Sequence, residues 1–202
     1  MPQFLFRKVA ALIATGALCT GAPVASADTT VVIVRHAEKP EAGLGQLKCK
    51  GLNRALALAP VLLERYGKPV AIYATNPSEL KNDKGIYYSY IRPLATIEPL
   101  AIRLGMPVNI SYGMTDVPNL VKELQSLSDG TVIVAWEHHW AANLAKALLT
   151  TGGGNPADVP AWNDADFDSI YVVQQTRDEQ GHPHAQFTKA QQNINNLTDN
   201  CP

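Results

Sequence analysis

The sequence predicts an α/β fold, a three-layer sandwich in which helices cover both faces of a mainly parallel central sheet. Two apolar runs rich in β-branched residues, at 29–34 and 131–135, are typical of strands buried on both faces. Segments with apolar residues at helical spacing alternate with further short apolar runs, an order that favours parallel strands joined by crossover helices. The 202 residues show no internal repeat, low-complexity tract or linker, so one such domain is expected.

In the first half of the chain, strands and helices are expected to alternate. The strand at 29–34 leads through a glycine-rich loop to a helix at 51–66, in which Pro60 predicts a kink or a break. A short strand is expected at 71–74. The polar stretch 76–85 has no periodicity and is expected to be a surface loop.

In the second half, apolar residues at helical spacing predict a helix at 94–104 and another at 117–127, where Asp116 is placed to cap the N-terminus. The strand at 131–135 precedes a helix at 141–149. Two closing segments flank a polar turn and predict an antiparallel hairpin at one edge of the sheet, at 169–174 and 184–187.

Residues 1–27 have the three-part pattern of a secretory signal peptide. Two basic residues precede an apolar run at 9–19, and the small residues Ala25-Ser26-Ala27 supply a cleavage site. The run is too short and wrongly flanked for a membrane span, and the pattern is favoured over an N-terminal core helix. We therefore expect a mature domain at 28–202 that is periplasmic or secreted, without a membrane span after cleavage.

The composition limits the classes of partner. The formal net charge is −1, and no basic run or stripe is present, so nucleic acid is not expected as a partner. No feature of the sequence predicts the oligomeric state.

Cleavage after residue 27 leaves two cysteines, Cys49 and Cys201, and an even count in an exported chain predicts one disulfide. Two inert thiols remain the alternative.

Arginines and histidines follow the predicted strands in a pattern that suits a phosphoryl group. Arg35-His36 comes directly after the first strand, and His138-His139 follows the strand at 131–135. Arg92 stands at a predicted helix start. Ligands of open parallel sheets bind beyond the carboxyl ends of the strands, and guanidinium groups match phosphate oxygens with paired hydrogen bonds. The pattern therefore predicts an anion pocket with two guanidinium groups and two imidazoles.

These motifs resemble those of the histidine phosphatase superfamily, which includes phosphoglycerate mutases and histidine acid phosphatases. The segment 34–39 resembles the strand-terminal Arg-His-Gly motif, and Leu47 to Ala55 is similar to the Leu-Thr-x-x-Gly-x-x-x-Ala helix start. Arg92 and Thr96 resemble the Arg-x-x-x-Thr pair, and His138 is similar to the second family histidine. The four pocket residues occur in family order over nearly the whole predicted mature chain.

The resemblance implies a phosphoglycerate mutase-like fold and a catalytic role for each of the four residues. His36 is the implied nucleophile, Arg35 and Arg92 bind the substrate phosphoryl oxygens, and His138 completes the anion pocket. A neutral imidazole is nucleophilic near neutral pH, and a phosphohistidine divides a difficult hydrolysis into two displacements. The resemblance implies no metal or cofactor. Ala37 replaces the family glycine, so the loop must have an ordinary backbone there.

The proton donor has three candidates. Some acid phosphatases of the superfamily have an aspartate directly after the second histidine, where this chain has His139. Asp116 lies roughly where the mutase-like branch has an acid, but it also fits a helix cap. Glu38 follows the nucleophile closely, and a solvated loop acid is its alternative interpretation. Arg54 is expected to be solvated.

The expected function is hydrolysis of phosphomonoesters, with a phosphorylated small molecule as substrate, through phospho-His36 and without metal. Two alternatives stay open: a phosphatase acting on phosphoproteins, and a non-catalytic anion-binding protein with the same fold. A metal site at His182 and His184 is disfavoured, because no third ligand is evident in the sequence. Substrate contacts are expected from the loops at 76–90 and 153–168.

Overall fold

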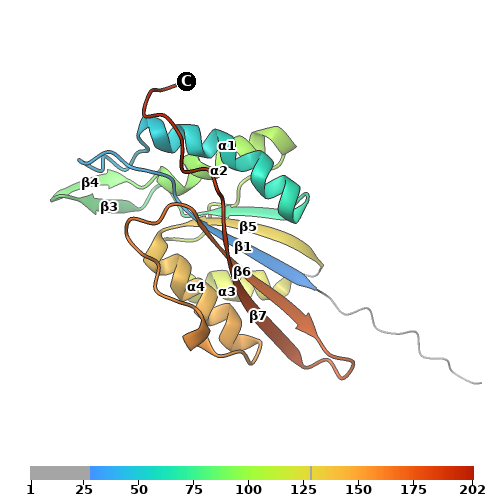
Figure 1. Cartoon of the computed structure of the whole chain (residues 1–202). Coiled ribbons are helices and arrows are strands. Elements are labelled where there is room, and N and C mark those ends of the chain that lie inside the picture. Colours follow the sequence, from blue (N-terminus) through green and yellow to red (C-terminus); the bar gives the residue numbers. More distant parts are fainter. Residues whose placement is uncertain (1–27, 128) are drawn as a thin grey trace, which may run out of the picture.

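The computed structural model describes residues 28–127 and 129–202, which form three layers (Figure 1). The export signal predicted at 1–27 lies outside these residues. Seven strands are β1 (Thr29–Arg35), β2 (Ala71–Ala74), β3 (Leu80–Asp83), β4 (Ile86–Ser89), β5 (Gly130–Trp136), β6 (Ser169–Arg177) and β7 (Pro183–Gln191) within the described part of the chain. The α-helices there are α1 (Cys49–Tyr66), α2 (Arg92–Leu104), α3 (Val117–Ser126) and α4 (His138–Thr151).

The central sheet of the described domain has the strand order β2-β5-β1-β6-β7. Strands β2, β5 and β1 run parallel, while β6 is antiparallel to β1 and β7 is antiparallel to β6. The α/β fold class and the edge hairpin predicted from the sequence are therefore confirmed. The hairpin is longer than predicted, because its pairing continues through polar residues to Arg177 and Pro183.

The two faces of the sheet are covered by different helix pairs, as Figure 1 shows above and below the strands. Alternate residues of a strand point to opposite faces. In β1, Val31 and Ile33 pack into a core cluster with α3 and α4, whereas Val32 and Val34 pack into a second cluster with α1 and α2. All four side chains are fully buried, which explains the continuous apolar run that predicted this strand. No described helix is long and apolar enough to cross a lipid bilayer.

Pro60 does not break α1, so the predicted interruption is wrong, while the predicted kink stays a prediction. The helix runs from Cys49 to Tyr66 with Pro60 inside it. Proline leaves the carbonyl four residues earlier without its helical partner, here that of Leu56. Both residues are exposed, so water can satisfy that carbonyl. A proline on the solvent-facing side is therefore tolerated inside this helix. The sequence prediction did not take into account on which side of the helix Pro60 lies.

The prediction of a surface loop at 76–85 is wrong in part, because β3 lies within it. Strands β3 and β4 form a separate hairpin, with Asp83 paired to Ile86. The two turn residues, Lys84 and Gly85, have φ values of 54° and 89°. Positive φ at both positions is typical of the tight turns that join twisted strands. The signal for this hairpin was the glycine turn followed by aromatic residues, rather than hydrophobic alternation.

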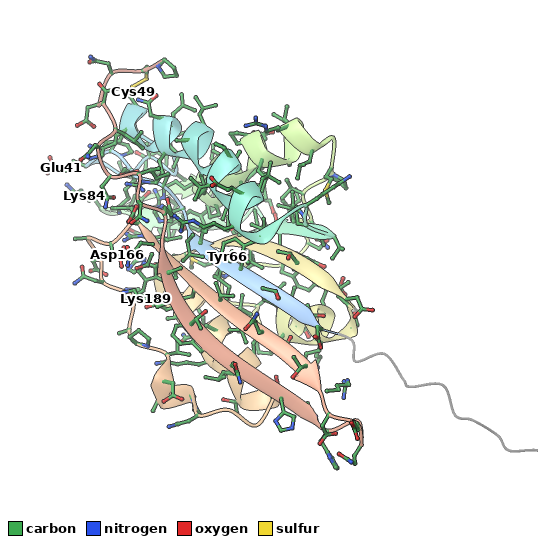
Figure 2. The ribbon with its side chains drawn as sticks, turned by 45° about the vertical axis from the view of Figure 1, so that its right-hand side comes forward. Glu41, Cys49, Tyr66, Lys84, Asp166 and Lys189 are labelled. Atoms are coloured by element: carbon green, nitrogen blue, oxygen red, sulfur yellow. A yellow bond between two sulfur atoms is a disulfide. The ribbon has the colours of Figure 1, made fainter. Side chains whose placement is uncertain are left out.

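Cys49 and Cys201 form a disulfide, which confirms the predicted pairing and excludes the two-thiol alternative in this structure. The bond joins the start of α1 to the C-terminal tail, as Figure 2 shows beside the labelled Cys49. The linked residues are 152 positions apart. A crosslink over so long a loop restricts the unfolded chain.

Removing this disulfide should lower the free energy of unfolding by about 2–4 kcal/mol, because the unfolded chain regains the entropy of an open loop. Urea unfolding of a Cys49→Ser, Cys201→Ser double variant beside the oxidised protein measures this difference. A change smaller than about 1 kcal/mol would show that closing the loop adds little to stability.

Candidate active site

The candidate residues lie where the carboxyl ends of β1 and β5 meet. Arg35 is the last residue of β1 and pairs with Trp136, the last residue of β5. The backbone N–H of His36 then donates to the Trp136 carbonyl at 2.9 Å. His138 is the first residue of α4, and Arg92 is the first residue of α2. Parallel pairing therefore places the Arg35-His36 segment beside the start of α4.

His36 is held in one tautomer by its own backbone neighbour. Its side chain is buried, and Nδ1 lies 2.8 Å from the carbonyl oxygen of Ala37. A carbonyl only accepts hydrogen bonds, so Nδ1 carries the proton and, in a neutral ring, Nε2 carries the lone pair. Nε2 makes no hydrogen bond with any described residue. The structure thus leaves the nitrogen with the lone pair available for attack.

Thr96 fastens this loop to α2. The backbone N–H of Ala37 donates to Thr96 Oγ1 at 2.9 Å, and this hydroxyl donates to the carbonyl of Arg92 at 2.8 Å. Ala37 is fully buried and has no positive φ, as expected for a chain with alanine in place of the family glycine. Gly51 lets α1 approach the same loop, because a Cβ there would lie 2.2 Å from the Glu38 carbonyl oxygen.

The pKa of His36 lies well below its ordinary value of 6.5. Burial is the largest cause, because it disfavours the charged ring. The hydrogen bond with the Ala37 carbonyl opposes this effect, while the positive charges of Arg92 and Arg35 add to it. These groups together keep the imidazole neutral and nucleophilic.

We expect the neutral His36 ring to persist at pH values where an unperturbed histidine is half protonated, about pH 6.5. Its lowered pKa means that the folded state binds fewer protons than the unfolded state. Its contribution to stability is therefore present above pH 6.5 and is lost as the pH falls through the folded pKa. Imidazole ¹⁵N NMR should show the Nδ1-protonated neutral tautomer. A His36 midpoint at or above about pH 6.5 would contradict this assignment.

Arg92 is buried against a carboxylate from the β3–β4 hairpin. Its Nη1 donates to Asp83 Oδ2 at 2.7 Å and to the Gly43 carbonyl at 3.2 Å, and its Nη2 donates to Asp83 Oδ1 at 3.3 Å. Asp83 also accepts from the backbone N–H of Gly45 at 3.0 Å. Burial alone would raise the pKa of Asp83, but these hydrogen bonds and the charge of Arg92 outweigh it and lower the pKa. Asp83 thus orients Arg92 and remains ionised.

Arg35 is held by backbone oxygens of the loop between η1 (Pro156–Asp158) and β6. Its Nη1 donates to the carbonyls of Asp164 and Asp166 at 2.7 and 3.0 Å. Its guanidinium lies over the Phe167 ring, 3.9 Å from the centroid. The Phe167 ring in turn lies 6.2 Å from that of His36, measured between centroids. The loop therefore fixes the direction of Arg35 beside the candidate nucleophile.

His138 lies between two carboxylates. Its Nε2 is 2.7 Å from Asp164 Oδ1, and its Nδ1 is 3.0 Å from Glu137 Oε1. Glu137 also caps α4, since its Oε2 accepts from the backbone N–H groups of His139 and Trp140. Burial would raise the pKa of Glu137, but its contacts with His138, the Trp140 N–H and Lys81 lower it to about 2. Glu137 is therefore a carboxylate at neutral pH, so it cannot donate a proton.

Buried polar atoms without hydrogen-bond partners are concentrated around this site. In the described residues they are Arg35 Nε, Arg92 Nε, Tyr90 Oη, His138 Nδ1 and Thr75 Oγ1. Buried donors without partners cost free energy and are rare in folded proteins. The Tyr90 ring meets that of His36 edge to face at 6.0 Å, and burial raises the Tyr90 pKa, so its hydroxyl stays protonated. Both guanidinium groups thus keep a buried Nε–H without a hydrogen-bond partner, and their charges act on His36, a combination that suits a phosphoryl-binding pocket.

The three candidate proton donors have different surroundings. Asp116 precedes α3 without capping it by its side chain, and its carboxylate accepts a hydrogen bond from Asn119 instead. It makes no hydrogen bond or ion pair with the four pocket residues. His139 is largely exposed but stacks against His138, with ring centroids 4.0 Å apart. His139 is therefore the candidate that lies beside the pocket.

The expectations for Glu38 and Arg54 are wrong, because both side chains are buried. Arg54 Nε and Nη2 donate to Glu38 at distances between 2.8 and 3.1 Å, and Arg54 Nη1 lies 3.3 Å from Asp168 Oδ1. Arg54 is 1% exposed and Glu38 is 7% exposed. A carboxylate bound by a guanidinium fork at this depth is a structural ion pair rather than a solvated loop acid.

Sequence reasoning missed several residues of the site. Asp83 lies in the hairpin that was expected to be a loop, and Asp164 lies in a loop without a periodic signal. Tyr90 and Glu137 lie close in sequence to Arg92 and His138, and this closeness was the one sequence feature that could have pointed to them.

At the far β6–β7 turn, His182 Nδ1 and His184 Nε2 lie 2.9 and 3.7 Å from Asp178, with both histidines exposed.

No family model and no curated protein matches the sequence. Among solved structures, a candidate phosphohistidine phosphatase SixA from Nakamurella multipartitia aligns with a TM-score of 0.52 and 15% identity, over 84% of this chain and 98% of that chain. The mycobacterial glucosyl-3-phosphoglycerate phosphatase, solved with inorganic phosphate, aligns with a TM-score of 0.51 and 16% identity, over 79% of this chain and 95% of that chain. Identity this low supports a statement about the fold alone. The α/β fold expected from the sequence is thus confirmed, and this chain shares the three-layer fold of these two phosphatase structures.

Proposed function

We propose that this protein is a phosphatase that hydrolyses phosphomonoesters by way of a phosphohistidine on Nε2 of His36. The observation that carries the proposal is the state of the His36 ring. Its Nδ1–H donates to the Ala37 carbonyl, its pKa is lowered, and the positive charges of Arg92 and Arg35 act on the ring. A neutral, oriented imidazole next to fixed cations is what attack on a phosphoryl group requires.

The reaction consists of two displacements at phosphorus. In the first, the Nε2 lone pair forms the N–P bond while the P–O bond to the leaving group breaks and the leaving oxygen takes the electron pair. In the second, water forms a new P–O bond and loses a proton to a phosphate oxygen or to solvent, the N–P bond breaks, and the electron pair returns to Nε2. The spare Nε–H groups of Arg35 and Arg92 and the hydroxyl of Tyr90 stabilise the charge on the phosphoryl oxygens.

The substrate class rests on the same pocket and on the fold. Four of the five buried polar atoms without partners belong to Arg35, Arg92, Tyr90 and His138, which together suit an anion. The structural neighbours include a protein described as a candidate phosphohistidine phosphatase and a glucosyl-3-phosphoglycerate phosphatase. Both descriptions support phosphoryl-transfer chemistry, and neither selects the natural substrate of this chain.

The test is release of phosphate from p-nitrophenyl phosphate in the presence of a chelator, combined with trapping of the phosphoenzyme. p-Nitrophenolate leaves as an anion, so this substrate reports on the nucleophile without depending on a proton donor. We expect metal-independent turnover and an acid-labile, alkali-stable label on His36 after rapid quenching. Turnover that stops in chelator, or a label on another residue, would contradict the proposed mechanism.

A further inference from the structure

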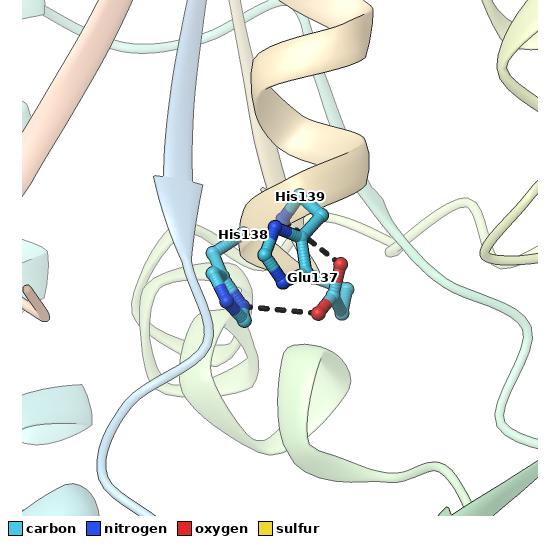
Figure 3. Close-up of side chains that lie close together, drawn as sticks. All are labelled: Glu137, His138 and His139. Atoms are coloured by element: carbon cyan, nitrogen blue, oxygen red, sulfur yellow. Dashed lines mark hydrogen bonds and ion pairs between the residues drawn. The ribbon is translucent and has the colours of Figure 1, made fainter. Parts of the chain in front are cut away.

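Glu137, His138 and His139 form a compact cluster of potential metal ligands at the start of α4. One ligand atom from each residue lies within 4.8 Å of the others. Figure 3 shows the two imidazole rings side by side, with the Glu137 carboxylate next to them. Glu137 and His138 are buried, while the His139 side chain is 66% exposed. The cluster therefore has a fixed inner part and one accessible ligand that is able to move.

The inner part contains an arrangement that a proton or a metal ion can stabilise. His138 Nδ1 lies 3.0 Å from Glu137 Oε1, yet the contact does not have hydrogen-bond geometry, and the nitrogen is buried without a partner. If Nδ1 carries a lone pair, two electron-rich atoms face each other at this distance. Tetrahedral zinc with bonds of about 2.0 Å places its ligand atoms about 3.3 Å apart. The Nδ1–Oε1 separation is close to that spacing.

Asp164 completes the pattern from outside. Its Oδ1 is 2.7 Å from His138 Nε2, the nitrogen that would not bind the ion. A proton on Nε2 donated to Asp164 leaves the lone pair on Nδ1. Metal-binding histidines commonly donate their second ring N–H to a carboxylate, which fixes the tautomer and strengthens the ligand. His138 therefore has the surroundings of a metal ligand on both ring nitrogens.

We propose that Glu137, His138 and His139 bind one zinc ion, and that the bound ion prevents a phosphoryl group from using the pocket. Imidazole and carboxylate ligands suit zinc better than magnesium or calcium, which prefer oxygen ligands alone. Two carboxylates, Glu137 and Asp164, offset the positive end of the α4 dipole and the charges of Arg35 and of Lys81, whose Nζ lies 4.0 Å from Glu137 Oε1. Three protein ligands leave a fourth position open to solvent.

The inhibitory part of this inference rests on the proposed function. His138 belongs to the anion pocket implied by the motifs, and it is linked to Arg35 because both contact Asp164. An ion on Nδ1 fixes His138 and reorients His139 across the start of α4. Anion binding requires a proton on His138 Nδ1, whereas zinc binding requires a lone pair there, so zinc and substrate are expected to compete.

Zinc binding is measured directly, by isothermal titration of chelator-treated protein and by metal analysis after dialysis. We expect one zinc per chain. His139→Ala and Glu137→Gln should each weaken binding by at least about tenfold, and Asp164→Asn should weaken it by about 10–100-fold. The matched control is the double variant His182→Ala, His184→Ala, which removes the other two exposed histidines and should bind zinc as the native protein does.

The competition is measured on p-nitrophenyl phosphate, comparing each protein with and without zinc. We expect zinc to raise KM in the native protein and in the His182→Ala, His184→Ala variant, and to have at least about tenfold less effect on His139→Ala. No zinc uptake, or uptake that is lost with His182 and His184 but not with His139, overturns the site. Uptake at the site with unchanged KM overturns the inhibition. Because uptake needs no turnover, a protein that binds zinc but releases no phosphate even in chelator refutes the proposed function and leaves the metal site standing.

Discussion

Replacing His36 by alanine should lower the rate of phosphate release by roughly 10⁴-fold or more, as expected when a covalent nucleophile is removed. The variant keeps the guanidinium groups and the Tyr90 hydroxyl, so it still has the buried donors that face the pocket. It lacks the nitrogen that forms the bond to phosphorus. The variant can therefore still bind the phosphoryl group but cannot form the phosphohistidine. For this reason KM should change less than kcat.

The measurement is steady-state turnover of p-nitrophenyl phosphate in chelator, with quantification of the trapped phosphoenzyme. Because His36 is buried against Tyr90 and Phe167, thermal unfolding of the variant must be compared with that of the native protein. Exposed His182→Ala is the matched control and should keep full activity. Free imidazole can enter the cavity left by His36→Ala, and partial rescue by imidazole would separate loss of the nucleophile from misfolding. Activity within tenfold of the native rate in folded His36→Ala would exclude His36 as nucleophile.

The parts of the fold that follow from local patterns could be predicted. The runs at 29–34 and 131–135 are rich in apolar β-branched residues because each face of these strands meets a helix layer, and the sequence pattern therefore predicts their burial. The same patterns placed His36 and His138 at one edge of the sheet, since parallel strands end together. The Cys49–Cys201 bond was predicted from the cysteine count that remains after removal of the predicted signal peptide.

The partners of the charged residues could not be predicted, because they come from segments distant in sequence. Arg92 is neutralised by Asp83 of the β3–β4 hairpin, and Arg35 is held by carbonyls near Asp164, 129 positions away. Backbone carbonyls carry no sequence signal at all. Arg54 appeared to be a solvated helix residue because a single charge does not reveal whether opposite charges reach it after folding.

The two arginines of the pocket show why both kinds of partner matter for the proposed chemistry. A bare pair of guanidinium groups beside His36 would repel each other at low dielectric. Asp83 offsets the charge of Arg92, and the loop carbonyls satisfy Arg35 while leaving its net charge intact. In each residue the Nη side is used by the protein and the Nε–H remains without a partner. The scaffold thus fixes both donors before substrate arrives, which lowers the reorganisation cost of binding.

The largest expected effect on stability is that of Arg54→Met, which should lower the free energy of unfolding by about 3–5 kcal/mol. Methionine fills much of the space but leaves the carboxylates of Glu38 and Asp168 buried without their cation, and these are 7% exposed each. Arg54 also donates to Gln192 and Asn195, so the segment after β7 loses two of its hydrogen bonds to α1. Urea unfolding with the disulfide intact measures the difference.

Two companion variants decide whether the loss comes from the buried charge. Lys84→Ala removes an ion pair with Glu41 in which both side chains are more than 60% exposed, so it should change stability by less than about 0.5 kcal/mol. Arg54→Met combined with Glu38→Gln and Asp168→Asn removes the charges left without a partner, and it should recover part of the stability lost in Arg54→Met. If the triple variant is no more stable than Arg54→Met, the hydrogen bonds to Gln192 and Asn195 dominate instead. Since Glu38 lies two residues after His36, the buried pair also holds the loop that carries the candidate nucleophile, and kcat should fall in Arg54→Met even under conditions where the protein remains folded.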